Sequence, residues 1–193
     1  GVAEVQTGLA FEAQIDLGDP GAPVTGRFLA LDLRRVHRGT QGLNAVRLRE
    51  GRWPESGAAL EAVVSESFAH ARGLRPGDQV RAVLNGRLQP VRVTGLAISP
   101  EYVFAGSAGA PDERSYGIWW VDAQRLSELL DLQGAFNQAV VRLESPASEP
   151  AVMAALDRLL EPYGSLGAVA RRDQLSARIV DDELDQLRVM GTV

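Results

Sequence analysis

Very few residues of this chain could carry covalent chemistry, and the best-spaced pair is Ser67 with His70. The two lie three residues apart, so a helix over residues 66–72 would place them on one face, where the histidine could activate the serine hydroxyl. The sequence has no Gly-x-Ser-x-Gly turn to expose such a nucleophile. We interpret the segment as a capped helix carrying a surface histidine and predict no enzymatic activity. A hydrolase with an unrecognised serine–histidine or carboxylate site is the alternative.

Metal and nucleotide sites lack their usual ligands. Cysteine is absent, and the only two histidines, His37 and His70, are far apart in the sequence. The acidic run at residues 181–185 lacks the oxygen ligands at alternate positions and the glycine that a calcium loop has. We therefore interpret it as the solvent-exposed face of a helix. All basic residues are arginines, which excludes a P-loop lysine, and the glycine-rich residues 106–109 precede a proline rather than a helix. We therefore expect neither a metal nor a cofactor.

Charge and hydropathy exclude two further classes of function. The net charge is −5 and no basic stripe is present, so we expect no nucleic-acid partner. Apolar residues make up 45% of the chain, which is typical of a folded globular protein. No stretch approaches the roughly 20 apolar residues that a membrane helix needs.

Four aromatic residues are the best candidates for contact with a partner or substrate. Tyr102 and Phe104 lie in a long loop over residues 99–115, and loops of this length often serve binding. Trp119 and Trp120 are adjacent, so on a strand they would face opposite sides of a sheet. We favour the interpretation that one tryptophan lies in the core and the other under the loop. The alternative is a contact surface formed by the loop and an exposed tryptophan.

The elements that must position these residues alternate between strand and helix. The strongest local signal is Asn85-Gly86 between two apolar runs, which predicts a β-hairpin, and Pro90 places part of that hairpin at a sheet edge. Together the patterns predict an α+β fold rather than a doubly wound parallel sheet. Strands are expected over residues 8–17, 23–36, 61–64, 80–84, 87–93 (continuing to 98), 118–121, 136–143 and 169–170, and helices over 66–72, 123–132, 149–161 and 174–190.

A succession of short motifs runs through the middle of the chain. The motifs are, in order, Glu50-Gly51-Arg52-Trp53-Pro54, Glu61-Ala62-Val63-Val64-Ser65, Gly73-Leu74-Arg75-Pro76-Gly77-Asp78, Val91-Arg92-Val93-Thr94-Gly95, Ser99-Pro100-Glu101-Tyr102 and Ile118-Trp119-Trp120-Val121-Asp122. In this order they resemble the MacB-like periplasmic core domain of FtsX-like ABC transporter permeases. The resemblance extends over about residues 46–143, and it depends on the succession rather than on any single motif.

The resemblance implies a fold of two parts. A porter-like α+β subdomain would be built from both ends of the chain, here residues 1–51 and 131–193. A mainly-β, sabre-like subdomain would be inserted between them, here residues 52–130. In this family the domain lies outside the cytoplasmic membrane between two membrane helices, so we expect apolar segments of about 20 residues before Gly1 and after Val193.

The function implied by the resemblance is mechanical. Similar permeases pair with a separate cytoplasmic ATPase subunit and with a second permease copy or a paralogue. They sit in the inner (cytoplasmic) membrane with this domain on the periplasmic side, and they export peptides, release lipoproteins or activate hydrolases. A periplasmic adapter, a lipoprotein or a peptide substrate would be the outer partner. The alternative is a free-standing periplasmic binding or adapter protein.

Overall fold

The computed structural model describes residues 1–18, 24–40, 42–103, 105–106, 112–174, 176–180 and 184 and mixes strands with α-helices and short 3-10 helices (η). This mixture confirms the predicted α+β class. The elements follow in the order β1 (Val2–Gly8), β2 (Ala10–Asp16), β3 (Val24–Leu31), α1 (Leu33–His37), β4 (Arg47–Gly51), β5 (Leu60–Ser65), α2 (Glu66–Arg72), β6 (Gln79–Leu84), β7 (Arg87–Ile98), η1 (Pro100–Tyr102), β8 (Tyr116–Asp122), α3 (Ala123–Leu129), β9 (Gln138–Leu143), η2 (Pro146–Ser148), α4 (Glu149–Leu160), η3 (Glu161–Tyr163) and η4 (Arg171–Asp173).

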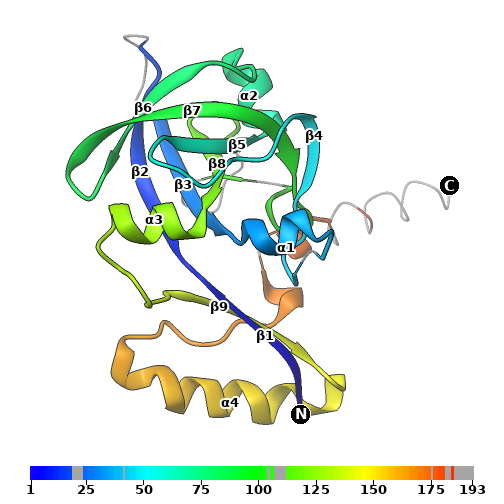
Figure 1. The fold of residues 1–193 in the computed structure, drawn as a ribbon. Coiled ribbons are helices and arrows are strands. Elements are labelled where there is room, and N and C mark those ends of the chain that lie inside the picture. Colours follow the sequence, from blue (N-terminus) through cyan, green and yellow to red (C-terminus); the bar gives the residue numbers. More distant parts are fainter. Residues whose placement is uncertain are drawn as a thin grey trace, which may run out of the picture. The chain divides into compact units, whose positions relative to one another are not determined.

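Seven strands form one sheet that closes on itself. Their order is β4-β7-β5-β8-β3-β2-β6, and β6 also pairs with β7. Six strands therefore make a closed barrel, while β4 extends the edge of β7 beyond the end of β6 (Figure 1). The β3–β8 and β5–β7 pairs are parallel and the others are antiparallel. Each strand of the ring of six is therefore paired on both sides over at least part of its length.

The interior of the barrel is filled around Trp119, whose side chain is fully buried. Its indole ring stacks on Phe28, with the ring centroids 5.8 Å apart, and meets the Phe68 ring edge-on at 5.9 Å. Alternate residues of the surrounding strands complete this inner cluster, among them Ala13, Ile15, Ala62, Val64, Val80, Ala82, Val91 and Val93. The period of two along each strand therefore separates an interior from an exterior face.

Two helices cover the two ends of the barrel. α2 follows β5 directly and α3 follows β8 directly, and β5 and β8 are antiparallel neighbours, so the helices begin at opposite ends (Figure 1). Phe68 of α2 and Leu126 of α3 are both completely buried in the inner cluster. Each helix thus places apolar side chains into one end of the barrel.

The barrel consists of two topologically equivalent halves. The β2–β3 hairpin pairs with the parallel strand β8 and its helix α3, and the β6–β7 hairpin pairs in the same way with β5 and α2. The halves meet at the β5–β8 pair, where Val63 lies opposite Trp120. Each hairpin takes its parallel strand from a distant part of the chain, so the two halves are interlocked.

Local chemistry explains how several of these elements begin and end. Asn85 and Gly86 have φ values of 49° and 70°, the left-handed values that a tight hairpin turn requires. Pro90 pairs with Arg81 on one side only, because the neighbouring strand β5 begins opposite Val91. The hairpin and the edge position of Pro90 are therefore confirmed.

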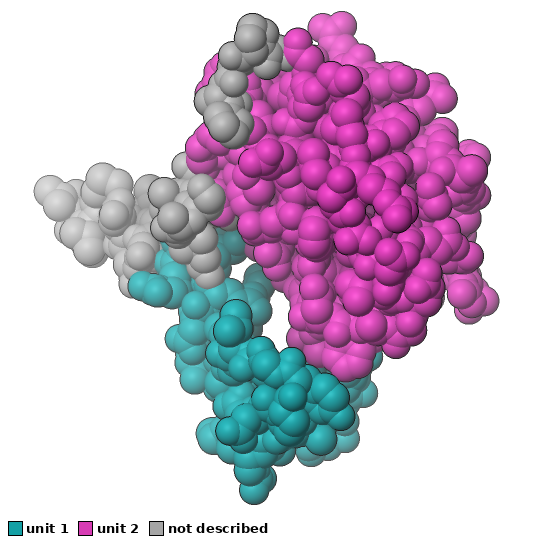
Figure 2. All heavy atoms as spheres, turned by 90° about the vertical axis from the view of Figure 1, so that its left-hand side faces the viewer, with its two compact units in different colours: residues 1–6, 140–193 teal, residues 7–139 magenta. Residues whose placement is uncertain are grey.

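The second compact unit is built from residues 1–6 and 140–193 (Figure 2). Here β1 pairs with β9; the Glu144 N–H donates to the Gly1 carbonyl and the Asn137 N–H to the Gly8 carbonyl, so the two strands are antiparallel. We call this pair the β1–β9 ribbon. α4 has no fully buried residue, and Leu159 is largely exposed. In the part of the chain that the structure describes, no helix is both long and apolar enough to cross a membrane.

Several local predictions differ from the structure, among them β4, which was not predicted as a strand. The expected strand over 23–36 ends at Leu31, because the Asp32 carboxylate accepts the Arg34 and Arg35 N–H groups and starts α1. β1 was not predicted, since its apolar residues alternate only loosely. Residues 169–170 form no strand, and α3 ends at Leu129, short of 132. Most of the predicted helix over 174–190 lies outside the described residues.

The compact units also divide at positions other than the predicted subdomain boundaries. The contacts separate residues 7–139 from the rest of the chain, whereas the prediction separated 52–130. The physical reason is strand pairing: β2 and β3 precede residue 52 but form ladders with β6 and β8. The assignment of porter-like and sabre-like subdomains stays a prediction.

The packing of Phe68 against Gly117 gives a test of the barrel core. A Cβ atom at Gly117 would lie 2.7 Å from the Phe68 ring, which is fully buried and cannot move aside freely. We expect Gly117→Ala to lower the free energy of unfolding by about 1–3 kcal/mol in urea denaturation. Gly57→Ala is the matched control, because a Cβ there would meet open space. Equal stability of the two variants would contradict this packing.

Candidate functional site

The most distinctive polar site lies on the exterior of the barrel, where Tyr102 and Ala105 of the long loop pack on the outer face of the sheet. The two predicted tryptophans separate here as adjacent strand residues must: Trp119 belongs to the inner cluster and Trp120 to an outer cluster with Leu29, Val63 and Ile118. Tyr102 of η1 packs edge-on against Trp120, with the ring centroids 6.3 Å apart. One tryptophan is therefore in the core and the other under the loop.

The burial of the four predicted contact residues determines which of them a partner could touch. Trp119 is 0% exposed and Trp120 only 3%, so neither ring offers a surface to a partner in this structure. Tyr102 is partly buried, and Phe104 lies outside the described residues. Val103, which was not predicted, is 50% exposed beside the anchored Tyr102. Among the described residues of this loop, Val103 is the accessible apolar side chain.

Tyr102 holds the loop through its hydroxyl as well as its ring. The side chains of Arg27 and Gln138 both interact with this hydroxyl. Burial, assisted by the negative charge of Glu101, raises the pKa of Tyr102 to about 12, so the phenol stays protonated at any physiological pH. A neutral hydroxyl of this kind can hold a loop in place but cannot act as a general base near pH 7.

Arg27 stands at the centre of the cluster and joins three strands. Its Nη1 lies 3.4 Å from Glu12 Oε1 on β2, and the Tyr116 hydroxyl of β8 donates to the same oxygen at 2.6 Å. Burial and the bond to Glu12 raise the pKa of Tyr116 to about 12. With Tyr102 added, these residues form the Arg27 cluster (Glu12, Arg27, Tyr102 and Tyr116), which ties the loop to the barrel wall.

Backbone contacts close both ends of the loop. Ser99 caps η1: its hydroxyl accepts the Glu101 N–H at 3.3 Å, and its carbonyl accepts the Tyr102 N–H at 3.0 Å. Farther on, the Asp112 N–H donates to the Ala105 carbonyl at 3.0 Å, and the Asp112 carboxylate accepts from the Ser115 hydroxyl and N–H. These contacts therefore hold the described residues at both ends of the loop in place.

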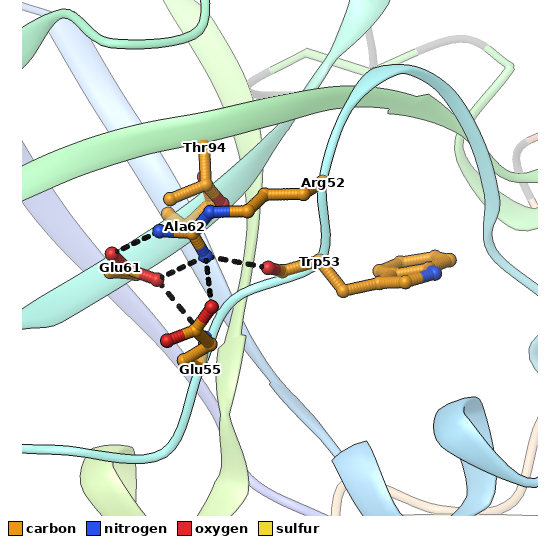
Figure 3. A network of polar contacts seen from close by, with 6 residues as sticks. All are labelled: Arg52, Trp53, Glu55, Glu61, Ala62 and Thr94. Carbon is orange, nitrogen blue, oxygen red and sulfur yellow. Dashed lines mark hydrogen bonds and ion pairs between the residues drawn. The ribbon is translucent and has the colours of Figure 1, made fainter.

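A second polar network lies where β4 ends, in the Gly51-Arg52-Trp53-Pro54 segment (Figure 3). The Arg52 guanidinium makes a bidentate pair with Glu61, with both N–O distances 2.7 Å, and also donates to the Trp53 carbonyl. The Arg52 N–H donates to the Thr94 carbonyl at 2.9 Å. Hydrogen bonding to Arg52 lowers the pKa of Glu61, whose side chain is only 11% exposed. This network fastens the chain leaving β4 to β5 and β7.

Two glycines make this second network possible. Gly51 lies opposite Gly95 in the β4–β7 ladder, and a Cβ at either position would come within 2.8 Å of backbone atoms of the other strand. Gly51 also has φ of 77°, which side chains other than glycine rarely tolerate. The close approach of the two backbones brings Arg52 within reach of Thr94 and Glu61.

Neither network has the parts of a catalytic centre. Within the described residues no hydrogen bond joins Ser67 to His70, and His70 is exposed on α2. No group of three or more metal-ligating side chains is found in the same part of the chain. What the two networks do is hold loops and strands in place.

Residues 15–159 match the family model described as the MacB-like periplasmic core domain. This chain belongs to that family. The match spans three quarters of the sequence and includes most of the barrel, the long loop, β9 and nearly all of α4. None of the curated proteins compared with the chain matches it.

Three solved structures resemble this MacB-like domain at low identity. The extracellular domain of the noncanonic ABC-type transporter YknZ from Gram-positive bacteria is 17% identical, with a TM-score of 0.49 over 87% of this chain and 80% of that one. The periplasmic region of MacB from Actinobacillus actinomycetemcomitans is 16% identical, with a TM-score of 0.42 over 82% and 67%. A domain of a putative permease protein from Porphyromonas gingivalis is also 16% identical, with a TM-score of 0.41 over 90% and 69%.

Sequence reasoning found some parts of the sites of this MacB-like domain and missed others. Tyr102 was predicted as a contact residue, whereas the motifs at residues 50–54 and 61–65 include Arg52 and Glu61 but gave no prediction that the two would pair. The Arg27 cluster was missed, because Glu12 and Tyr116 are 104 residues apart and no spacing rule connects them. Only the aromatic content of the long loop pointed toward this region.

The Arg52–Glu61 pair predicts a pH-dependent contribution to the stability of the MacB-like domain. Because the folded-state pKa of Glu61 lies below the ordinary glutamate value, its contribution is present above that value and is lost as the pH falls through the folded-state pKa. We expect Glu61→Gln to lower the free energy of unfolding at pH 7 by up to about 1 kcal/mol, limited by the half-exposed arginine. The difference from wild type should shrink as the pH is lowered below 4.

Urea denaturation at pH 7 and at pH 3 measures this effect. Glu55→Gln is the control, because the Glu55 side chain is 74% exposed and lies 3.5 Å from Arg52. A difference between wild type and Glu61→Gln that is the same at both pH values would contradict the prediction.

Proposed function

We propose that this domain is the extracytoplasmic part of an ABC transporter permease subunit. In this role it couples ATP-driven movement of membrane helices to a substrate or partner outside the membrane. The family assignment supports the proposal, and the names of the three similar structures, all transporters or permeases, agree with it. The ATPase is a separate cytoplasmic subunit, and a second permease copy or a paralogue completes the complex.

The single observation that carries a mechanical role is how the larger unit is connected. Residues 7–139 form one continuous insert, and the chain enters and leaves it through β1 and β9, which are paired neighbours in the β1–β9 ribbon. The chain connection between the two units therefore consists of two strands that are hydrogen-bonded neighbours. A closed barrel with filled ends resists deformation, so it can transmit a displacement rather than absorb it.

The loop over residues 99–115 is the proposed contact with the outer partner or substrate. It is anchored by the Arg27 cluster, and it presents Val103 to solvent. The handled molecule is a peptide, a lipoprotein or a protein activated outside the cell membrane. Each of these has apolar side chains that could pack on an exposed valine.

The proposed location can be tested by thiol labelling, because this chain has no cysteine of its own. Ser56 is exposed, so we expect Ser56→Cys in the parent protein to react with a membrane-impermeant maleimide in intact spheroplasts, as fast as in lysed ones. The labelled protein should stay in the membrane pellet after an alkaline wash. Labelling only after lysis would contradict the proposal. Release by the wash would instead favour a free-standing periplasmic adapter.

The proposed contact can be tested at Val103. We expect Val103→Ser to change the free energy of unfolding by less than about 0.5 kcal/mol, because the side chain is half exposed. It should nevertheless lower the activity of the parent transporter by about fivefold or more, the effect of losing a central contact residue. Val83→Ser is the matched control, since Val83 is 40% exposed on the β6–β7 hairpin. Equal activity of the two variants would remove the loop from the proposal.

A further inference from the structure

The strand β4 lies at an open edge of the large sheet (Figure 1). Among the described strands it pairs with β7 alone, whereas each strand of the ring of six has partners on both sides. Gly51 at its end is exposed, and because glycine has no side chain, this exposure is of backbone atoms. The free edge of β4 can therefore form a ladder of hydrogen bonds with another extended chain.

The side chains of this edge divide into apolar and basic ones. Val46, which precedes β4, is only 4% exposed, and both Val46 and Leu48 pack on the outer cluster of the barrel. Arg47 and Arg49 alternate with them along the chain and are exposed, and Arg49 forms an ion pair with Glu66 at 3.5 Å. An added strand would therefore lie beside arginine side chains, and cross-strand neighbours of opposite charge stabilise a sheet.

The chain around β4 is basic although the whole chain is acidic. Residues 32–49 hold five arginines and one acidic residue, a net charge of +4. The other residues hold 15 arginines and 24 acidic residues, a net charge of −9. Among the described residues no carboxylate forms an ion pair with Arg34, Arg38 or Arg47, and all three are exposed. This segment therefore offers unpaired positive charge to a partner that carries negative charge.

The arginines of α1 and of β4 border the same apolar cluster. Leu31, the last residue of β3 before the α1 cap, packs on the outer cluster as Val46 does. The same edge also adjoins the proposed contact loop. Arg47 pairs with Ile98, the last residue of β7, and the loop begins at the next residue. A molecule that packs on Val103 is therefore close to the basic edge.

We propose that the open edge of β4 binds an acidic polypeptide segment as an added strand, with its carboxylates beside Arg47 and the arginines of α1. An extended peptide has both the donors and the acceptors that a strand edge requires, whereas a lipid phosphate has acceptors only. The choice of a handled polypeptide as the source of this strand rests on the proposed function. The binding itself is a property of the isolated chain and is measured without transport.

Fluorescence anisotropy with a labelled peptide of alternating glutamate and threonine tests the proposal. Threonine favours an extended chain, and the alternation places the glutamates on one face of it. We expect Arg47→Glu to weaken binding by about tenfold or more at low salt, because a repulsion replaces an attraction. Arg87→Glu is the matched control and should change the affinity by less than about twofold. Arg87 is also an exposed strand arginine, at the far end of β7 from the residues that pair with β4.

Two peptide controls require no change in the domain. A peptide with glutamine in place of glutamate should bind about tenfold or more weakly, because it carries no charge. A peptide with a central proline should also bind more weakly, because proline lacks the N–H that a ladder needs. In the wild type, the glutamate–threonine peptide should slow hydrogen exchange of the amides of residues 47–51.

Several results would overturn the proposal. These are absence of binding, equal binding of the glutamate and glutamine peptides, equal effects of Arg47→Glu and Arg87→Glu, and unchanged amide exchange in β4. Binding of the chain to phosphatidylglycerol vesicles but not to the peptide would assign the arginines to a lipid surface and would also overturn it. Each of these results leaves the thiol labelling in spheroplasts, and with it the proposed function, unaffected.

Discussion

The closure of the sheet is the constraint on which the rest of the structure depends. Because β6 pairs with both β2 and β7, six strands enclose a narrow interior whose size is set by the side chains that fill it. Trp119 takes up the centre between Phe28 and Phe68, and the glycines at positions 26 and 117 leave room for these rings. The open ends are filled by α2 and α3. Because each half takes its parallel strand from a distant part of the chain, every strand is necessary to close the ring.

Because apolar side chains fill the barrel interior, the polar contacts described above lie on its exterior. The outer face of β3, β8 and β5 is covered by its own apolar cluster around Trp120, and the long loop lies over it. The ionisable groups on this face are paired with one another rather than aimed at an open cavity: Arg27 with Glu12 and the two tyrosines, Arg52 with Glu61. Such pairs position chain segments.

In the sequence, the larger compact unit interrupts the smaller one. In a family whose members are periplasmic core domains, the barrel is an insert that the chain enters and leaves through paired strands.

The sequence by itself determined the α+β class, the Asn85-Gly86 hairpin, the helix after residue 65, the opposite faces of Trp119 and Trp120, and the family. Each of these depends on neighbours in the chain: a turn needs two residues with positive φ, a strand alternates with a period of two, and short motifs keep their order. Only the tertiary structure decided the closure of the sheet, the boundary at residues 7–139, the Arg27 cluster and the hydrogen bonds between Asn137 and Ala10. Residues 12 and 116, or 10 and 137, become neighbours only when distant strands pair, and no local periodicity encodes which edge a strand will choose.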